Sequence, residues 1–455
     1  MSQLKRDLGL WSAAAIVVGT VIGSGIFIVP KSMILNVGTP GMVLFVFLFG
    51  GLLSLGGALT YAELAAMLPV EGGEYVYLRE AYGPMWAFIY GWAQLLLAKS
   101  ASIATLATGF YLYLANFFPI LEGVITSMTL PIVGLVEIRN GQIFAMFLIG
   151  ALGLLNYFGV RIGGNVQVAV TIVKVAAIAA IILVGLFSSV GTVDHFSTAV
   201  KSVGGASGFF AALVAALWAY DGWNNVSMVA SEVQNPQRNL PLALIIGTLA
   251  VMLIYMLANV AYFYVLPAEG VANSDRVAGE MMRRIFGAPG AGLVSIAAMI
   301  SIFAALNGSI LTGARVPFAV AKDGLMWPSL AKIHPTYFTP ANSIVALSLW
   351  SMVIVLSGGY DFLFNLVIFA SWILYGMATA SVIVLRRKRP DLHRPYKTIG
   401  YPFVPILFVL VTLALLGQTF YDRPGQSMLG LVIIALGLPL YFYWSRKARA
   451  AGLKI

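Results

Sequence analysis

Two short polar interruptions in otherwise apolar stretches are the residues best suited to bind a small molecule. The first runs from 19 to 27 and reads GTVIGSGIF, and the second runs from 218 to 225 and reads WAYDGWNN, about 200 residues further on. Irregular backbone inside a bilayer is tolerated only where it is buried in protein or lines a watery cavity, because each unsatisfied peptide group costs several kcal/mol. We therefore expect both interruptions to line one site.

The chemistry available at these interruptions is recognition of a zwitterion. Unwound residues Gly23, Ser24 and Gly25 would expose peptide N–H groups at the start of a half-helix, which attract a carboxylate. Exposed carbonyls at the end of another half-helix would accept hydrogen bonds from an ammonium. A glycine trio alone could serve helix packing, but a matching interruption in a second segment is typical of transporter sites. The pair predicts binding of an α-amino acid.

Four polar residues within apolar stretches need partners. Lys174 has about ten apolar residues on each side, and a lone ammonium there costs about 2.5 to 3.5 kcal/mol, so it must bind protein groups unless it snorkels to the interface. Lys99 is either a vestibule-facing cation or a structural partner for a carbonyl. Glu63 is expected to pair with a nearby arginine, and Asn307 to make an interhelical hydrogen bond.

The elements that position these residues are membrane-spanning helices. The chain of 455 residues is 60% hydrophobic and 10% charged, with a mean hydropathy of +0.92, which excludes a soluble domain. A spanning helix needs about 20 apolar residues. Such segments run approximately over 10–35, 41–68, 84–118, 143–160, 166–188, 206–230, 240–266, 288–314, 343–357, 360–385, 402–420 and 428–445.

The net charge of +10 is spread over short loops, which fits membrane topology better than a nucleic-acid surface. The excess of Lys and Arg in alternate loops and in the last residues predicts that both termini are cytoplasmic. We interpret the first apolar run as a spanning helix, because its Ala-rich stretch stands too early for a signal-peptide cleavage site.

Catalytic and metal chemistry have little support in the sequence. With no Cys, disulfides, thiolate metal sites and cysteine nucleophiles are excluded. The three His lie far apart, so we expect no metal or other cofactor. No spaced acid pair or Ser/His arrangement stands within the apolar segments, which argues against a membrane enzyme. A non-transporting receptor or channel is a further alternative, although a channel would not need two interruptions suited to zwitterions.

Several motifs resemble the L-type amino acid transporters of the amino acid-polyamine-organocation superfamily, in their bacterial form. They follow the family order along almost the whole chain. They are GTVIGSGIF at 19–27, YAEL at 61–64, GGEY at 72–75, WAYDGWN at 218–224, NP at 235–236, RNLP at 238–241, RPDL at 389–392 and RP at 394–395.

The resemblance implies an all-α integral membrane protein of about twelve transmembrane helices with a leucine-transporter-like fold. In that fold, residues 1–188 would form a first repeat of five helices and residues 206–385 a second, inverted repeat. Helices 1 and 6 would be discontinuous. Residues 402–455 would hold helices 11 and 12 and a cytoplasmic tail.

The resemblance also implies a set of site residues. Backbone N–H groups would bind the substrate carboxylate, backbone carbonyls would hold its amine, and three side chains would lie near the substrate or its gate. The N–H groups would be those of Ser24, Gly25 and Ile26. The carbonyls would be those of Val21, Trp218 and Asp221. The three side chains would be those of Asn224, Tyr255 and Ser371. The ammonium of Lys174 would replace the sodium ion of sodium-coupled relatives and bridge the Gly23 carbonyl to the Ser309 hydroxyl.

The activity implied by the resemblance is sodium-independent transport of L-amino acids in the cell membrane, commonly by exchange. We favour neutral substrates, small ones among them, since related exchangers of small neutral amino acids also carry the acid at Asp221. Two alternatives stay open: a proton-coupled symporter, and an exchanger that accepts cationic amino acids through Asp221. The expected partners are amino acids and lipid. A disulfide-linked heavy subunit is excluded by the lack of Cys.

Overall fold

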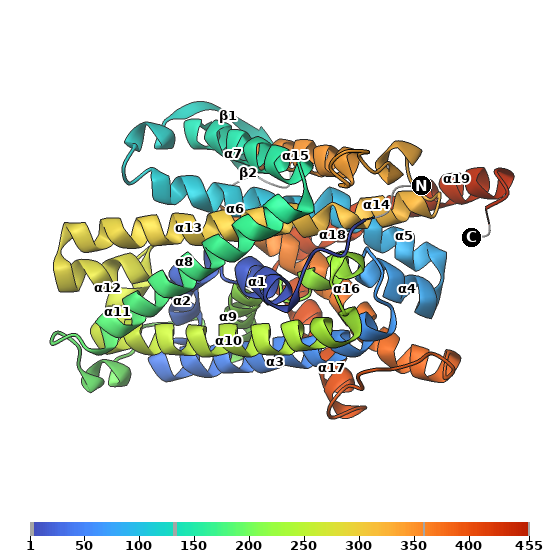
Figure 1. Ribbon diagram of the computed structural model, residues 1–455. Coiled ribbons are helices and arrows are strands. Elements are labelled where there is room, and N and C mark those ends of the chain that lie inside the picture. The colour runs from blue at the N-terminus through green and yellow to red at the C-terminus, as the bar shows by residue number, and fades with distance from the viewer. Residues whose placement is uncertain (1–3, 131–133, 358–359, 454–455) are drawn as a thin grey trace.

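The computed structural model describes residues 4–130, 134–357 and 360–453, and helices dominate it. Figure 1 shows long helices that run in one general direction and pack into a single bundle. Both termini lie at one end of the bundle, on the right of the view. The short helices α11 (Ala268–Ala272) and α12 (Val277–Phe286) lie at the opposite end.

The first half of the described chain contains eight α-helices, one π-helical turn, one short 3-10 helix and a hairpin. In order they are α1 (Leu10–Val21), α2 (Gly25–Val37), α3 (Pro40–Met67), α4 (Glu74–Tyr82), α5 (Pro84–Ala93), η1 (Gln94–Ala98), α6 (Lys99–Leu114), η2 (Pro119–Glu122), β1 (Val124–Leu130), β2 (Gly134–Arg139), α7 (Asn140–Tyr157) and α8 (Val160–Leu186).

The second half continues with helices in the part that the structure describes. Besides α11 and α12, they are η3 (Val193–Ser197), α9 (Gly205–Tyr220), η4 (Asn225–Glu232), α10 (Pro236–Val265), α13 (Ala288–Gly313), α14 (Arg315–Lys322), η5 (Pro328–Ala331), α15 (Ala341–Val355), α16 (Tyr360–Lys388), α17 (Phe403–Asp422), α18 (Pro424–Ala435) and α19 (Gly437–Ala450).

The described helices confirm an all-helical membrane protein. Nine are long and apolar enough to cross a bilayer, and the bent pair α1 and α2 makes ten. Two further expected spans contain shorter helices, since α15 has 15 residues and α9 stops after 16 residues at its interruption. Each of the twelve apolar segments predicted from the sequence therefore contains a helix.

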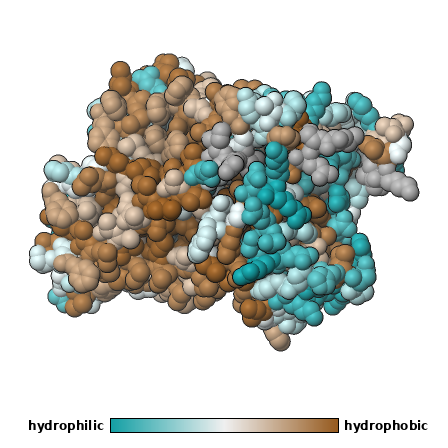
Figure 2. Space-filling model, in the orientation of Figure 1, coloured by the Kyte–Doolittle hydropathy of each residue, from teal (hydrophilic) through white to brown (hydrophobic). Residues whose placement is uncertain are grey.

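The surface divides as a bilayer would require. Figure 2 shows hydrophobic side chains over most of the visible face, across α8, α10 and α13. Hydrophilic side chains gather at the end of the bundle where the termini lie. Exposed apolar side chains such as Leu253 and Leu293, each more than 60% exposed, are therefore expected to face lipid.

The two predicted helix interruptions are present. α1 ends at Val21, Ile22 is extended (φ −73°, ψ 92°), and α2 leaves at an angle of 41°. α9 ends at Tyr220 because Asp221 is extended (φ −60°, ψ 141°). Gly222 then has φ +104°, a conformation that favours glycine. The chain resumes as the 3-10 helix η4.

The two interruptions also touch each other. The Thr20 hydroxyl donates a hydrogen bond of 2.9 Å to the Gly222 carbonyl. A Cβ atom added at Gly25 would lie 2.7 Å from the Cα atom of Ala219, so α2 and α9 can approach this closely only with glycine at that position. Segments about 200 residues apart thus meet at one point inside the bundle.

Two features were not predicted from the sequence. The apolar stretch after the third span forms the antiparallel hairpin β1–β2, in which Ser127 pairs with Glu137. The third span itself is not a uniform α-helix, because η1 inserts a π-helical turn directly before Lys99. Such a turn changes the direction in which the following side chains point.

Candidate functional site

A small cavity lies where the two interruptions meet. Its volume is about 20 Å³, roughly the room for one water molecule, so an amino acid could enter only if the walls moved apart. Seven of the predicted site residues line it: Val21, Gly23, Ser24, Gly25, Trp218, Asp221 and Ser309. The other lining residues are Thr20, Ser102, Leu106, Gly222 and Asn225.

One wall of the cavity can bind an anion. α2 begins at Gly25, so the N–H groups of Gly25 and Ile26 lie in its first turn, where the helix itself supplies no acceptor. The helix dipole adds partial positive charge at the same point. The Ile26 side chain is fully buried and does not line the cavity, so only its backbone N–H is suited to the predicted role.

Backbone carbonyls at the ends of α1 and α9 are held in place by α10. The Tyr255 hydroxyl lies 3.0 Å from the Val21 carbonyl oxygen and 2.9 Å from that of Ala219. One side chain thus braces the last turns of both α1 and α9. A carbonyl oxygen has two lone pairs, so the Val21 oxygen keeps one for an ammonium. Tyr255 itself does not line the cavity.

The charged groups beside the cavity have partners inside the protein. Asp221 accepts a hydrogen bond of 2.9 Å from the Tyr375 hydroxyl, and Lys99 lies within electrostatic range of the same carboxylate. The Lys99 ammonium donates to the Asn225 side-chain oxygen at 2.7 Å and is 4% exposed. Of the two interpretations left open for Lys99, the contact with an amide oxygen matches the structural partner.

Two predicted residues, Asn224 and Ser371, do not line the cavity. Asn224 donates instead to the buried carboxylate of Glu74, which also accepts from Tyr90 at 2.9 Å. Ser371 is buried one helical turn before Tyr375. Sequence reasoning chose Asn224 and missed its neighbour Asn225, because the direction of each side chain is decided by the turn that leads into η4.

The predicted partners of Lys174 were wrong, although its burial was expected. The ammonium donates to the carbonyls of Gly19 at 2.7 Å and Ile22 at 2.6 Å. Ser301, two helical turns before Ser309 on α13, donates to the Ile22 carbonyl at 2.9 Å. The break after Val21 turns the Ile22 carbonyl toward α8 and α13, and Ser309 lines the cavity instead.

Two other sequence predictions are confirmed. Glu63 is fully buried and accepts hydrogen bonds of 2.9 Å and 2.7 Å from Arg386. Asn307 on α13 donates to Gln167 on α8 at 2.9 Å, which is an interhelical hydrogen bond. Within the described residues, no group of three or more His, Asp or Glu is arranged to hold a metal ion.

Comparison with known proteins identifies the relatives of this chain. Residues 8–442 match the family model described as amino acid permease. The serine/threonine exchanger SteT of Bacillus subtilis is 34% identical over 451 residues, which cover 98% of each chain. The human cystine/glutamate transporter is 33% identical over 453 residues, 98% of this chain and 87% of the relative. The mouse b(0,+)-type amino acid transporter 1 is 34% identical over 445 residues, 97% of this chain and 88% of the relative.

Proposed function

Because this chain belongs to the amino acid permease family, within its L-type amino acid transporter branch, we propose that it exchanges neutral L-amino acids without sodium. The family and these relatives are transporters, not enzymes. The observation that carries the proposal is the cavity at the meeting point of the two helix interruptions, which brings the N-terminus of α2 close to the Val21 carbonyl held by Tyr255.

Each end of the zwitterion has a complementary wall. The carboxylate would accept from the N–H groups of Gly25 and Ile26, beside Ser24. The ammonium would donate to carbonyl oxygens of Val21, Trp218 and Asp221. In the conformation described, the space is water-sized, so we propose that binding accompanies the opening of the bundle on one side at a time, as alternating access requires.

Preference for neutral side chains follows from the local charges. A carboxylate facing a site would attract a cationic side chain if it stood alone. Asp221, however, is hydrogen-bonded by Tyr375 and lies within electrostatic range of the buried Lys99. Since this carboxylate already has a hydrogen-bond donor and a nearby cation inside the protein, it supports neutral substrates over cationic ones.

Lys174 takes the place in which a coupling cation would be expected. Its ammonium neutralises the carbonyl dipoles at the break of α1, so no sodium ion is needed there. This contact supports sodium-independent exchange and links substrate binding at the break to the packing of α1 on α8.

The arrangement in the membrane completes the proposal. We propose that spans one to five (residues 1–188) and six to ten (residues 206–385) form inverted repeats, followed by two further spans over 402–455. Both termini would be cytoplasmic in the cell membrane, supported by the excess of basic residues at that end. With no cysteine, no disulfide can link the chain to a second subunit.

Counterflow into liposomes tests the proposal. Purified protein is reconstituted, vesicles are loaded with unlabelled alanine or left empty, and uptake of radiolabelled alanine, leucine and arginine is followed without sodium. Rapid uptake of alanine or leucine only into loaded vesicles is the expected result. Accumulation in empty vesicles driven by a pH gradient would instead identify a proton-coupled symporter, and uptake of arginine alone would exclude the proposed preference.

A further inference from the structure

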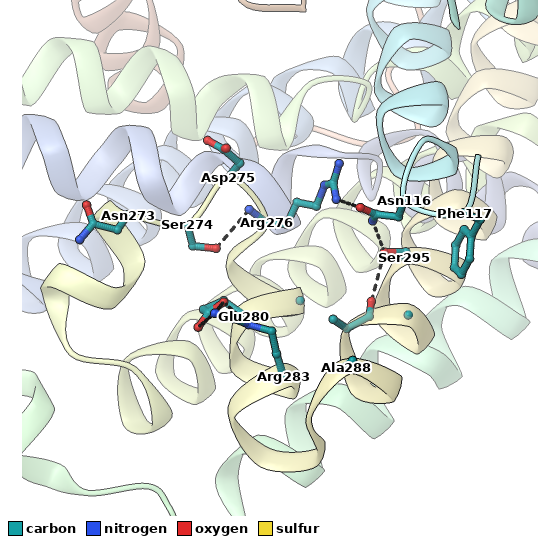
Figure 3. Close-up of a pocket in the computed structure, with 13 residues that line it drawn as sticks. Asn116, Phe117, Asn273, Ser274, Asp275, Arg276, Glu280, Arg283, Ala288 and Ser295 are labelled. Carbon is teal, nitrogen blue, oxygen red and sulfur yellow. Dashed lines mark hydrogen bonds and ion pairs between the residues drawn. The ribbon is translucent and has the colours of Figure 1, made fainter. Parts of the chain in front are cut away.

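A much larger cavity lies at the end of the bundle opposite the termini. This outer pocket has a volume of about 600 Å³, within the range of small-molecule sites. It is formed by the end of α6, the loop before α12, α12 itself and the start of α13 (Figure 3). Its polar and charged lining includes Asn116, Asn273, Asp275, Arg276, Glu280 and Arg283.

Arg276 brings a positive charge to this pocket without a carboxylate partner among the described residues. Its guanidinium donates to the side-chain oxygen of Asn116 and, at 2.7 Å, to the Leu112 carbonyl. It also lies 5.6 Å from the ring centroid of Tyr113. Figure 3 shows the side chain reaching across the pocket to Asn116. All of these partners are electrically neutral.

The other charges of the outer pocket are already balanced. Asp275 pairs with Lys31 of α2 at 2.5 Å. The Arg283 guanidinium donates two hydrogen bonds, each 2.8 Å long, to the carboxylate oxygens of Glu280. Among the charged residues that line the pocket, Arg276 is therefore the one without an oppositely charged partner in the described chain. The ligand that complements a guanidinium best is a carboxylate, which can accept two parallel hydrogen bonds.

The contacts of Arg276 lead inward to the central cavity. Tyr113, beneath the guanidinium, packs edge-on against Phe27 with ring centroids 6.4 Å apart. Both rings are 1% exposed, and Phe27 lies two residues after Gly25, which lines the cavity. The pair Lys31–Asp275 ties the same α2 helix to the same loop. The contacts from Arg276 through Tyr113 to Phe27 thus connect the outer pocket with the helix that carries Gly25 of the central cavity.

We infer that the outer pocket is an encounter site for amino acids, in which Arg276 binds the substrate carboxylate before the central site opens. Asp275 and Glu280 are already paired, so the carboxylate is the end of the substrate that this pocket recognises. A guanidinium that turns to form two parallel hydrogen bonds with a carboxylate weakens its contacts with Leu112 and Asn116, which help to hold the loop against α6. Binding therefore loosens the packing of Arg276 over Tyr113. The ligand identity rests on the proposed function.

The lack of cysteine in the chain allows a direct test. The variant N273C carries one thiol at an exposed position of the pocket, and its reaction with a membrane-impermeant thiol reagent reports occupancy. Alanine should slow the labelling several-fold, propionate should slow it in part, and methylamine should not. Adding R276Q should abolish this protection, whereas adding R276K, which keeps the charge, should preserve part of it.

Transport kinetics separate the outer pocket from the central site. R276Q should raise KM for alanine on the outer face about tenfold and leave KM on the inner face unchanged. R284Q is the matched control, since Arg284 is exposed on the same helix α12 but does not line the pocket; it should change neither. An equal effect of R276Q on both faces, or none, would overturn the inference.

The two proposals fail in different ways. Counterflow without protection of N273C by alanine would reject the encounter site and leave the exchanger intact. Protection by alanine and propionate without any counterflow would keep a carboxylate site at Arg276 and reject amino acid exchange.

Discussion

The ammonium of Lys174 lies 2.6 Å from the carbonyl oxygen of Ile22, the residue at which the first spanning helix breaks. The side chain is fully buried, and the Gly19 carbonyl is its second acceptor. A helix break leaves carbonyl oxygens without hydrogen-bond donors, and a buried ammonium has no water as acceptor. The hydrogen bonds between them meet both needs, so this lysine stabilises the unwound segment and connects it to α8.

Replacing Lys174 by alanine should reduce exchange at least tenfold, because the carbonyls at the break lose their partner. The measurement is alanine counterflow in proteoliposomes, with folding checked by size-exclusion chromatography. K201A, at an exposed loop lysine, should behave as the unchanged protein. Normal exchange by K174A would remove any role of this lysine in transport.

Gly25→Ala should prevent binding and destabilise the fold. The added methyl would lie 2.7 Å from Ala219 Cα and 2.9 Å from its Cβ, and overpacking of this kind costs about 1–3 kcal/mol. Thermal unfolding in detergent and binding of labelled alanine measure the two effects. G41A is the matched control, since nothing lies within 4 Å of its added methyl; a similar loss there would point to a general intolerance of the helices.

Asp221→Asn should weaken exchange of neutral amino acids about tenfold. The amide oxygen can still accept from Tyr375, but the buried Lys99 then keeps only one carboxylate, that of Glu74, within electrostatic range. The rates of alanine and arginine counterflow are compared, with Y375F as the variant that removes the hydrogen bond and keeps the charge. Selective loss of arginine exchange in D221N would show that the carboxylate serves cationic substrates.

Loss of one partner of the buried pair Arg315–Glu232 should strongly destabilise the fold. Arg315 is 1% exposed and its two contacts with Glu232 are 2.7 Å and 3.0 Å long. R315Q leaves an uncompensated buried carboxylate, which costs about 3–5 kcal/mol, and should lower the thermal midpoint by many degrees. The double variant R315L/E232L should recover most of the loss. R283Q, which breaks an exposed pair, should leave the midpoint nearly unchanged.

Mild acid should weaken the contact between Glu71 and Lys322. Burial alone would raise the pKa of the Glu71 carboxyl, but hydrogen bonds from Lys322 and the backbone outweigh it, so the pKa is lowered. A carboxyl whose pKa is lower in the folded than in the unfolded state contributes folding stability at pH values above the unfolded pKa. That stability is lost as the pH falls through the folded pKa. E71Q should therefore lose less thermal stability than the unchanged protein between pH 6 and pH 4, by a small margin because Lys322 is 62% exposed. Equal losses would contradict this.

The sequence by itself determined the solvent, the fold class and the positions of the two helix interruptions. Composition alone excluded a soluble domain, because 60% hydrophobic residues could be accommodated only in lipid. The interruptions at 19–27 and 218–225 could be predicted, since glycine and polar residues disfavour a regular helix locally. Burial of Lys174 also followed from its flanking residues, as did the pairing of Glu63 with an arginine.

Only the tertiary structure decided which groups meet. Lys174 contacts Ile22 instead of Gly23, Asn225 instead of Asn224 lines the cavity, and Arg276 lies over Tyr113 from a distant loop. The physical reason is rotational. A side chain's direction depends on the rotation of its helix about its own axis and on a few unwound residues, and both are set by packing against segments far away in the chain.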